Sequence, residues 1–169
     1  PLDVLKERDG HVPDAPNKEP LYHDTVSALK DLLKSLLQKE LTPHGLQSMF
    51  EHLGPWIRSS KEHERERAVE VGATLLEFYR DKLNVSTVVP FYNLGVLVAL
   101  FSPRCSDSLA SIRLRAVDCA YYLLYIQLCY EGFAHDYRDE MVERLKDLKK
   151  GLEDPDFTIL FNTCYNIAM

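Results

Sequence analysis

The sequence predicts an all-α fold, namely a segment of an α-solenoid with about seven helices. Two observations carry this prediction. From about residue 21 onward, apolar residues recur with the three-to-four-residue period of helices. The chain also repeats itself at an interval of 48 residues, within the range typical of stacked helical hairpins. The one β-branched cluster, residues 85–89, is followed by Pro90 and fits a helix start better than a strand.

Composition limits the class of protein. The 169 residues suit one domain or one stretch of a repeat array, and 46% hydrophobic with 27% charged residues is ordinary for a soluble protein. A net charge of −6 argues against nucleic acid as a partner, because phosphate binding requires a basic face. The longest apolar run, residues 119–130, is shorter than the ~20 residues that span a bilayer.

Four cysteines lie among apolar residues of helical period and form no C-x-x-C pair. Buried free cysteine behaves as a small hydrophobe, so they predict a reducing, cytoplasmic compartment. The four are Cys105, Cys119, Cys129 and Cys164.

The first 20 residues predict a flexible linker or extended end, since they contain four prolines and Gly10 without apolar period. The helical repeat segment is predicted over residues 21–169. A first helix over 22–40 carries one apolar face. It either docks on the solenoid or lies in a membrane interface; its charges nearly cancel, which favours docking. The face comprises Val26, Leu29, Leu33, Leu36 and Leu37.

Two helices follow, with recognisable ends. Thr42 and Pro43 predict a cap and first helical position, and Gly54-Pro55 predicts the end or a kink of this helix. Trp56 is expected to fill space beneath the turn. The next helix, over 60–83, is predicted to open with a capping box of Ser59 and Glu62. Its buried face would be Ala68, Val71, Leu75, Leu76 and Tyr79.

Four more helices complete the segment. One over 88–101 is apolar nearly all round and is expected to be covered on several sides. The next, over 107–130, has the core line Ile112, Ala116, Cys119, Leu123 and Tyr130. A helix over 136–150 carries the stripe Met141, Leu145, Leu148 and Leu152, and the last helix begins at Asp154-Pro155.

The 48-residue shift aligns two arginines. Arg65 meets Arg113 and Arg67 meets Arg115, each pair just before an Ala-Val dipeptide. The stretch "DSLASIRLRA" resembles the HEAT motif, in which Asp is followed by an apolar residue, Arg and Ala. More widely, "HERERAVEVGATLLEFY" and "YEGFAHDYRDEMVERL" resemble the Maestro heat-like repeat proteins, which are much longer than this chain.

The resemblance implies a structural role for the arginines. In HEAT arrays the Arg of the second helix meets an Asp of the turn, so Arg113, Arg65 and Asp107 are expected to form a ladder along the stack. The alternative is a solvated arginine without a fixed partner. Arg67 and Arg115 are expected to face solvent.

The sequence gives little evidence for a catalytic, cofactor-binding or metal-binding site. No phosphate loop, nucleophile elbow or H-E-x-x-H motif occurs, since Arg67 stands where the second histidine would be required after His63. We therefore expect no catalytic residue, cofactor or metal. The acidic run of Glu62, Glu64, Glu66 and Glu70 predicts a solvated face, or else a protein-binding patch. The tyrosines predict core packing, with binding anchors as the alternative; they are Tyr121, Tyr122, Tyr125 and Tyr130.

The preferred function is a non-enzymatic scaffold that binds other proteins. The alternative is a membrane-associated trafficking protein; the resemblance implies endolysosomal membranes and small GTPases as partners, with a location in the cytoplasm or peripherally on the lysosomal membrane. The last helix carries more apolar positions than one contact requires, so self-association through Phe157 and Phe161 is also expected.

Overall fold

The computed structural model describes residues 18–84, 88–153 and 156–168. Within these ranges there are seven α-helices and one 3₁₀ helix and no strand, so the all-α prediction is confirmed. The elements are α1 (Lys18–Lys39), α2 (Pro43–Ile57), α3 (Glu62–Lys82), α4 (Leu94–Phe101), η2 (Ser102–Ser106), α5 (Ala110–Tyr130), α6 (Glu140–Lys150) and α7 (Phe157–Ala168).

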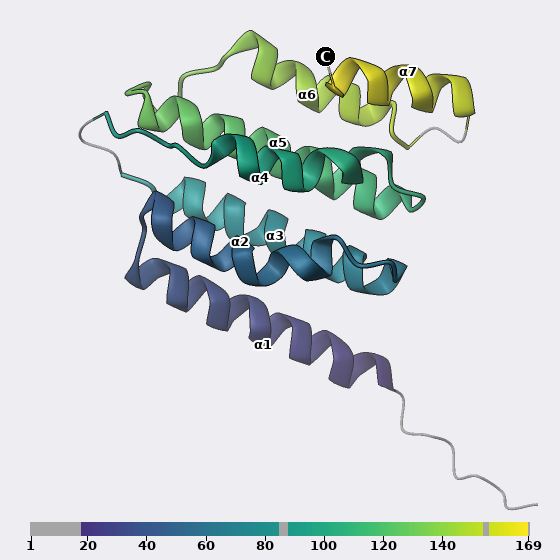
Figure 1. Cartoon of the computed structure of the whole chain (residues 1–169), viewed down its shortest axis with the longest axis horizontal. Coiled ribbons are helices and arrows are strands. Elements are labelled where there is room, and N and C mark those ends of the chain that lie inside the picture. The colour runs from purple at the N-terminus through teal and green to yellow at the C-terminus, as the bar shows by residue number, and fades with distance from the viewer. Residues whose placement is uncertain (1–17, 85–87, 154–155, 169) are drawn as a thin grey trace, which may run out of the picture.

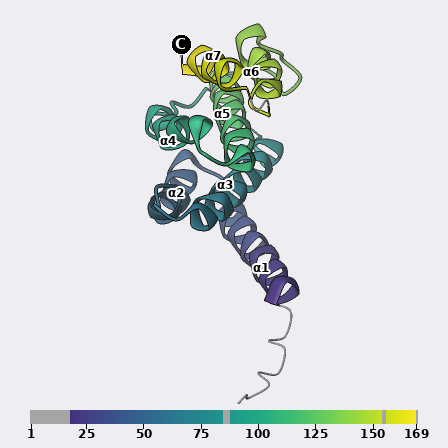
Figure 2. The same ribbon diagram turned by 90° about the vertical axis from the view of Figure 1, so that its right-hand side faces the viewer.

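The helices stack in two rows (Figures 1 and 2). We call α1, α3, α5 and α6 the first row, because each packs on the next; α2, α4, η2 and α7 form the second row. The hairpins α2–α3 and α4–α5 both run from the second row to the first. The hairpin α6–α7 runs in the opposite order, because α6 packs on α5 and α7 packs on η2. The third copy of the repeat is thus placed differently from the first two.

The core is centred on the contact between α3 and α5 of the first row and extends to α2 and α4 of the second row. Both predicted core lines, that of α3 and that of α5, are buried throughout. Gly72 on α3 lies beneath two aromatic rings, where an added Cβ would come within 3.0 Å of Phe101 and 3.2 Å of Phe50. The rings of Phe50 and Phe101 meet edge-on, with centroids 5.5 Å apart. A larger residue at position 72 would separate α3 from this pair.

Some predicted helix ends are confirmed and others are wrong. The Gly45 amide donates to the Thr42 hydroxyl at 3.0 Å, as expected of a cap. The helix continues through Pro55 to Ile57, since a proline in the last turn removes only one main-chain hydrogen bond. The predicted capping box is also wrong, because the Ser59 hydroxyl instead donates to the Glu64 carboxylate at 2.5 Å.

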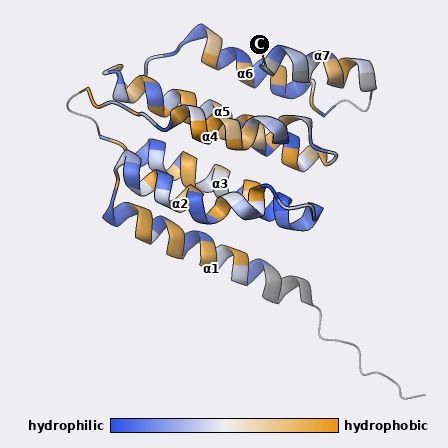
Figure 3. Cartoon of the chain, in the orientation of Figure 1, coloured by the Kyte–Doolittle hydropathy of each residue, from blue (hydrophilic) through white to orange (hydrophobic). Residues whose placement is uncertain are grey.

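The predicted apolar stripes on α4 and α6 are only partly buried. The predicted helix over 88–101 begins at Leu94, and Val88 and Val96 are exposed, so this helix is not covered on all sides even though it is hydrophobic along its length (Figure 3). On α6, Met141 is exposed and its neighbour Val142 is buried.

The first helix docks on the solenoid. It begins at Lys18, earlier than predicted, and packs on α3, where the Lys30 ammonium lies 2.5 Å from the Glu70 carboxylate. Leu37 is fully buried, but Leu29 and Leu36 of the predicted face remain exposed. Part of the α1 apolar face is therefore uncovered.

Candidate functional site

Arg65 joins the first hairpin to the second through Asp107. Its Nε donates to Oδ2 at 2.8 Å and its Nη2 to Oδ1 at 3.0 Å, a bidentate pair. The two side chains are only 9% and 2% exposed. The third guanidinium nitrogen, Nη1, donates to the carbonyl oxygens of Ser59 and Ser60 at 3.1 and 2.9 Å. Arg65 therefore binds the turn of its own hairpin and the turn of the next.

The charges of this pair stabilise each other. The hydrogen bond to Asp107 raises the pKa of Arg65, although burial opposes the charged form. Burial also acts to raise the pKa of Asp107, but hydrogen bonds from Arg65 and from the Leu109 amide outweigh it and place this pKa below its ordinary value. Arg104 adds a second cation, with Nη1 3.0 Å from Oδ2 of Asp107. Asp107 is ionised at neutral pH.

Arg113 is buried at the equivalent position of the second hairpin, but it does not bind the Asp107 carboxylate. Its Nη1 donates to the carbonyl oxygens of Asp107 and Ser108, both at 2.9 Å, which repeats the contacts of Arg65 with its own turn. Its Nε and Nη2 donate to the Leu152 carbonyl oxygen at 3.2 and 3.0 Å. The carboxylate of Asp107 faces the preceding hairpin. Asp154, the matching acid of the next turn, lies outside the described residues.

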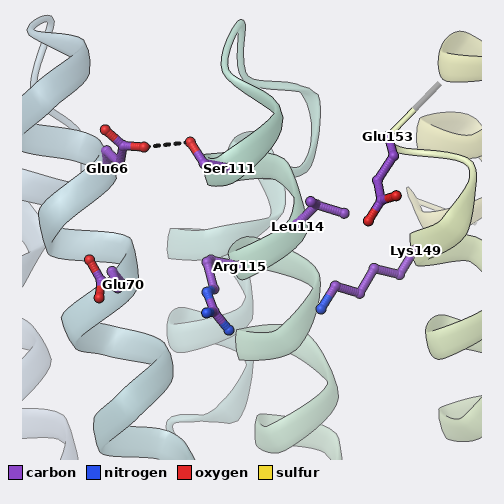
Figure 4. Close-up of a pocket in the computed structure, with 7 residues that line it drawn as sticks. All are labelled: Glu66, Glu70, Ser111, Leu114, Arg115, Lys149 and Glu153. Carbon is purple, nitrogen blue, oxygen red and sulfur yellow. Dashed lines mark hydrogen bonds between the residues drawn. The ribbon is translucent and has the colours of Figure 1, made fainter. Parts of the chain in front are cut away.

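A polar groove crosses the first row where α3, α5 and the end of α6 meet (Figure 4). We call it the α3–α5–α6 groove; its volume is about 390 Å³. Its lining combines three carboxylates, two cations, a hydroxyl and one apolar side chain. These belong to Glu66, Glu70, Ser111, Leu114, Arg115, Lys149 and Glu153.

Carboxylates of α3 accept hydrogen bonds from hydroxyls of α5 along this face. Ser111 donates to Glu66 at 2.6 Å, the contact drawn in Figure 4, and Tyr122 donates to Glu77 at 3.1 Å. Before α5 begins, the Ser108 hydroxyl donates to Glu62 at 2.8 Å. A hydroxyl donor is neutral, so it fixes the position of the carboxylate without cancelling its charge.

The cations of the groove converge on α5. The Asp118 carboxylate accepts hydrogen bonds from Lys149 Nζ of α6 at 2.7 and 2.9 Å and from Arg115 Nη1 at 3.3 Å. Arg115 is exposed, as predicted: its side chain is 56% exposed even though it forms an ion pair with Asp118. The α3 side of the groove therefore carries Glu66 and Glu70, whereas the α6 side carries both Lys149 and Glu153, an arrangement suited to a partner with both charges.

The tyrosines of α5 divide between core and surface. Tyr121 and Tyr130 are buried, and the Tyr130 hydroxyl bonds that of Tyr79. Tyr122 and Tyr125 are half-buried, and the Arg80 guanidinium lies 4.8 Å from the centroid of the Tyr122 ring. Burial, together with the Glu77 charge and hydrogen bond, raises the pKa of Tyr122. Core packing therefore describes Tyr130, whereas Tyr121 is buried but also lines a second pocket, where its hydroxyl donates to Glu143 at 2.9 Å.

Histidine and cysteine show no metal-binding arrangement in the part of the chain that the structure describes: no group of three potential ligands comes together. Here Cys105, Cys119 and Cys129 are buried in the core and form no disulfide, and burial raises the pKa of Cys119 well above its ordinary value.

The predicted self-association site is exposed where it is described. Phe161 is 60% exposed, with Ile159 and Tyr165 also exposed on α7. The side chain of Phe157 lies outside the described residues. Within 18–84, 88–153 and 156–168, no helix is long and apolar enough to cross a membrane.

Sequence reasoning missed most of the groove. It identified the acidic run of α3, which includes Glu66 and Glu70, as a solvated face or protein-binding patch. It did not connect this run to Lys149 and Glu153, because these residues are some 80 positions away. The signal that links them is the stacking of α6 on α5, which the sequence repeat alone does not predict.

Comparison with known proteins identifies the family. The family model described as Maestro, HEAT repeats matches residues 63–169. Maestro heat-like repeat-containing protein family member 1 of Mus musculus is 57% identical over 155 residues, or 92% of this chain and 10% of the relative. The Homo sapiens member 1 is 54% identical over 96% of this chain, again 10% of the relative.

A more distant relative belongs to the same family. Member 2A of Mus musculus is 31% identical over 88% of this chain. No solved structure matches the chain. The chain spans about a tenth of the length of the member 1 relatives. From the family match and these identities, the chain belongs to the Maestro heat-like repeat family.

Proposed function

We propose that this chain is a non-catalytic scaffold segment that binds other proteins through the α3–α5–α6 groove. The observation that carries the proposal is the groove itself, in which side chains from three stacked helices surround one space. Stacked helical repeats offer extended surfaces of this kind. The partners to test first are small GTPases, because the family resemblance implies them.

The charge pattern supports a polar protein surface as the partner. The carboxylates of Glu66 and Glu70 lie on one side and the Lys149 ammonium with the Glu153 carboxylate on the other, with Leu114 between them. Complementary charges at an interface set orientation and association rate more than affinity. Arg115 and Lys149 are the side chains that a partner carboxylate would meet.

The test is capture of interacting proteins with the tagged chain, followed by binding measurements on each purified candidate. The groove variant is Glu66→Lys, compared with Glu51→Lys, which makes the same charge change on the exposed face of α2. Partners are expected to bind the native chain and the Glu51 variant and to lose affinity for the groove variant. Equal affinity for all three would exclude this groove as the binding site.

A second candidate function, peripheral membrane contact, rests on the exposed leucines of α1. Leu32 and Leu36 are 57% and 41% exposed and lie one helical turn apart. We propose that this face contacts a bilayer in the trafficking role that the family resemblance implies, on endolysosomal membranes. Flotation with anionic vesicles would show binding by the native chain and its loss in Leu32→Asp. Flotation equal for both would exclude the leucine face.

A further inference from the structure

An apolar groove lies at the end of the stack opposite to α7, between α1, α2 and α3. We call it the Trp56 groove; its volume is about 280 Å³. The expected position of Trp56 beneath a turn is wrong: its side chain is 56% exposed and lines this groove. The other apolar lining residues are Val26, Leu29, Leu53, Ala68 and Val71, and the charged lining residues are Glu64 and Arg67.

The two rows end unevenly at this groove. The first row continues beyond α3 to α1, whereas the described part of the second row ends at α2 (Figures 1 and 2). At the next level of the stack, α4 packs on both α2 and α5 and so occupies the second-row position beside its neighbours. The Trp56 groove is the corresponding position beside α2 and α1.

The sequence repeat indicates which residues would occupy the second-row position beside α2. Phe101 packs edge-on against Phe50, which precedes it by 51 residues. Leu53 stands 48 residues before Phe101 and is its equivalent in the repeat. The residue 51 positions before Leu53 is Leu2, and Leu5 lies three positions further along, a spacing typical of one face of a helix.

We propose that residues 1–8, "PLDVLKER", dock in the Trp56 groove as the second-row neighbour of α2, with Leu2 against Leu53. These residues belong to the same chain but lie outside the described ranges. The connection to α1 is long enough: residues 9–17 can span about 30 Å when extended, whereas a helix with its side chains is only about 10 Å wide. The linker then shortens from residues 1–20 to residues 9–17.

Trp56 is the sole tryptophan, so its fluorescence reports on this groove alone. The experiment compares the full chain with a variant that lacks residues 1–8, measuring emission wavelength and acrylamide quenching. Docking predicts a red shift and stronger quenching on deletion, because Trp56 loses its cover. The full-length Leu2→Asp variant should behave like the deletion, and the matched Lys6→Gln variant like the native chain.

Circular dichroism of each variant checks that the helices are retained, and the Leu2→Asp variant preserves the test if the deletion does not fold. Identical emission and quenching in the native chain and Leu2→Asp would overturn the proposal. A blue-shifted emission that depends on protein concentration but not on residues 1–8 would also overturn it, since a second copy would then be the occupant.

Discussion

Replacing Asp107 by Asn tests the link between the two hairpins. The substitution preserves the shape of the side chain but removes its charge and one of the two acceptor oxygens that bind Arg65. The Arg65 side chain, 9% exposed, then stays buried with three neutral acceptors, the one remaining side-chain oxygen at position 107 and the carbonyl oxygens of Ser59 and Ser60. An uncompensated buried cation is the main source of the expected loss.

Removing one partner of a buried ion pair costs about 3–5 kcal/mol. Since Arg65 retains two carbonyl partners, we expect the lower end, about 3 kcal/mol in the free energy of unfolding. That is a large part of the ~5–15 kcal/mol typical of a folded domain. For a chain of this length it corresponds to a fall in melting temperature of roughly 6–12 °C.

The assay is urea unfolding followed by far-UV circular dichroism, with the m-value checked for each variant. The control is Arg115→Ala, which removes an exposed arginine from its ion pair with Asp118 and should cost at most about 1 kcal/mol. A double-mutant cycle of Asp107→Asn with Arg65→Met measures the coupling between the two residues. If Asp107→Asn costs no more than Arg115→Ala, the pair does not hold the hairpins together.

Four further outcomes are expected. Because the folded-state pKa of Asp107 is depressed, its contribution to stability is present above the ordinary pKa of about 3.9 and is lost as the pH falls below it; acid titration should therefore destabilise Asp107→Asn less than the native chain. Arg113→Ala leaves the Leu152 carbonyl oxygen without its two guanidinium donors and should cost about 1–3 kcal/mol in urea unfolding; an unchanged midpoint would contradict this. A chelator of divalent ions should leave the melting temperature unchanged, and a marked fall would reveal a metal site. Phe161→Asp should reduce any concentration-dependent sedimentation that the exposed α7 face causes, and equal behaviour of native and variant chains would exclude that face.

The helices and most core positions could be predicted because each depends on local spacing. Leu75, Leu76 and Tyr79 are buried where the helical period placed them, and so are Ile112 and Leu123. The 48-residue repeat also anticipated that Arg65 and Arg113 would hold equivalent positions. Both guanidinium groups indeed bind two carbonyl oxygens of the turn before their own helix.

Features that depend on neighbouring helices were harder to predict. The HEAT resemblance suggested Arg113 as a partner of Asp107, yet the Asp107 carboxylate faces Arg65 of the preceding hairpin. Met141 and Val142 are adjacent and both apolar, so only the packing of α6 on α5 decides which one is buried. Periodicity identifies a face of a helix, but the partner of that face is decided by the stack.

The double role of Arg65 bears on how the chain unfolds. In a stack of repeats, the strength of coupling between neighbours decides whether repeats melt together or one at a time. Arg65 contacts the Ser59–Ser60 turn within its own hairpin and the Asp107 turn of the next, so opening of either turn breaks bonds of the same guanidinium group. One side chain thus ties the local opening of two hairpins together and favours a single cooperative transition over stepwise fraying.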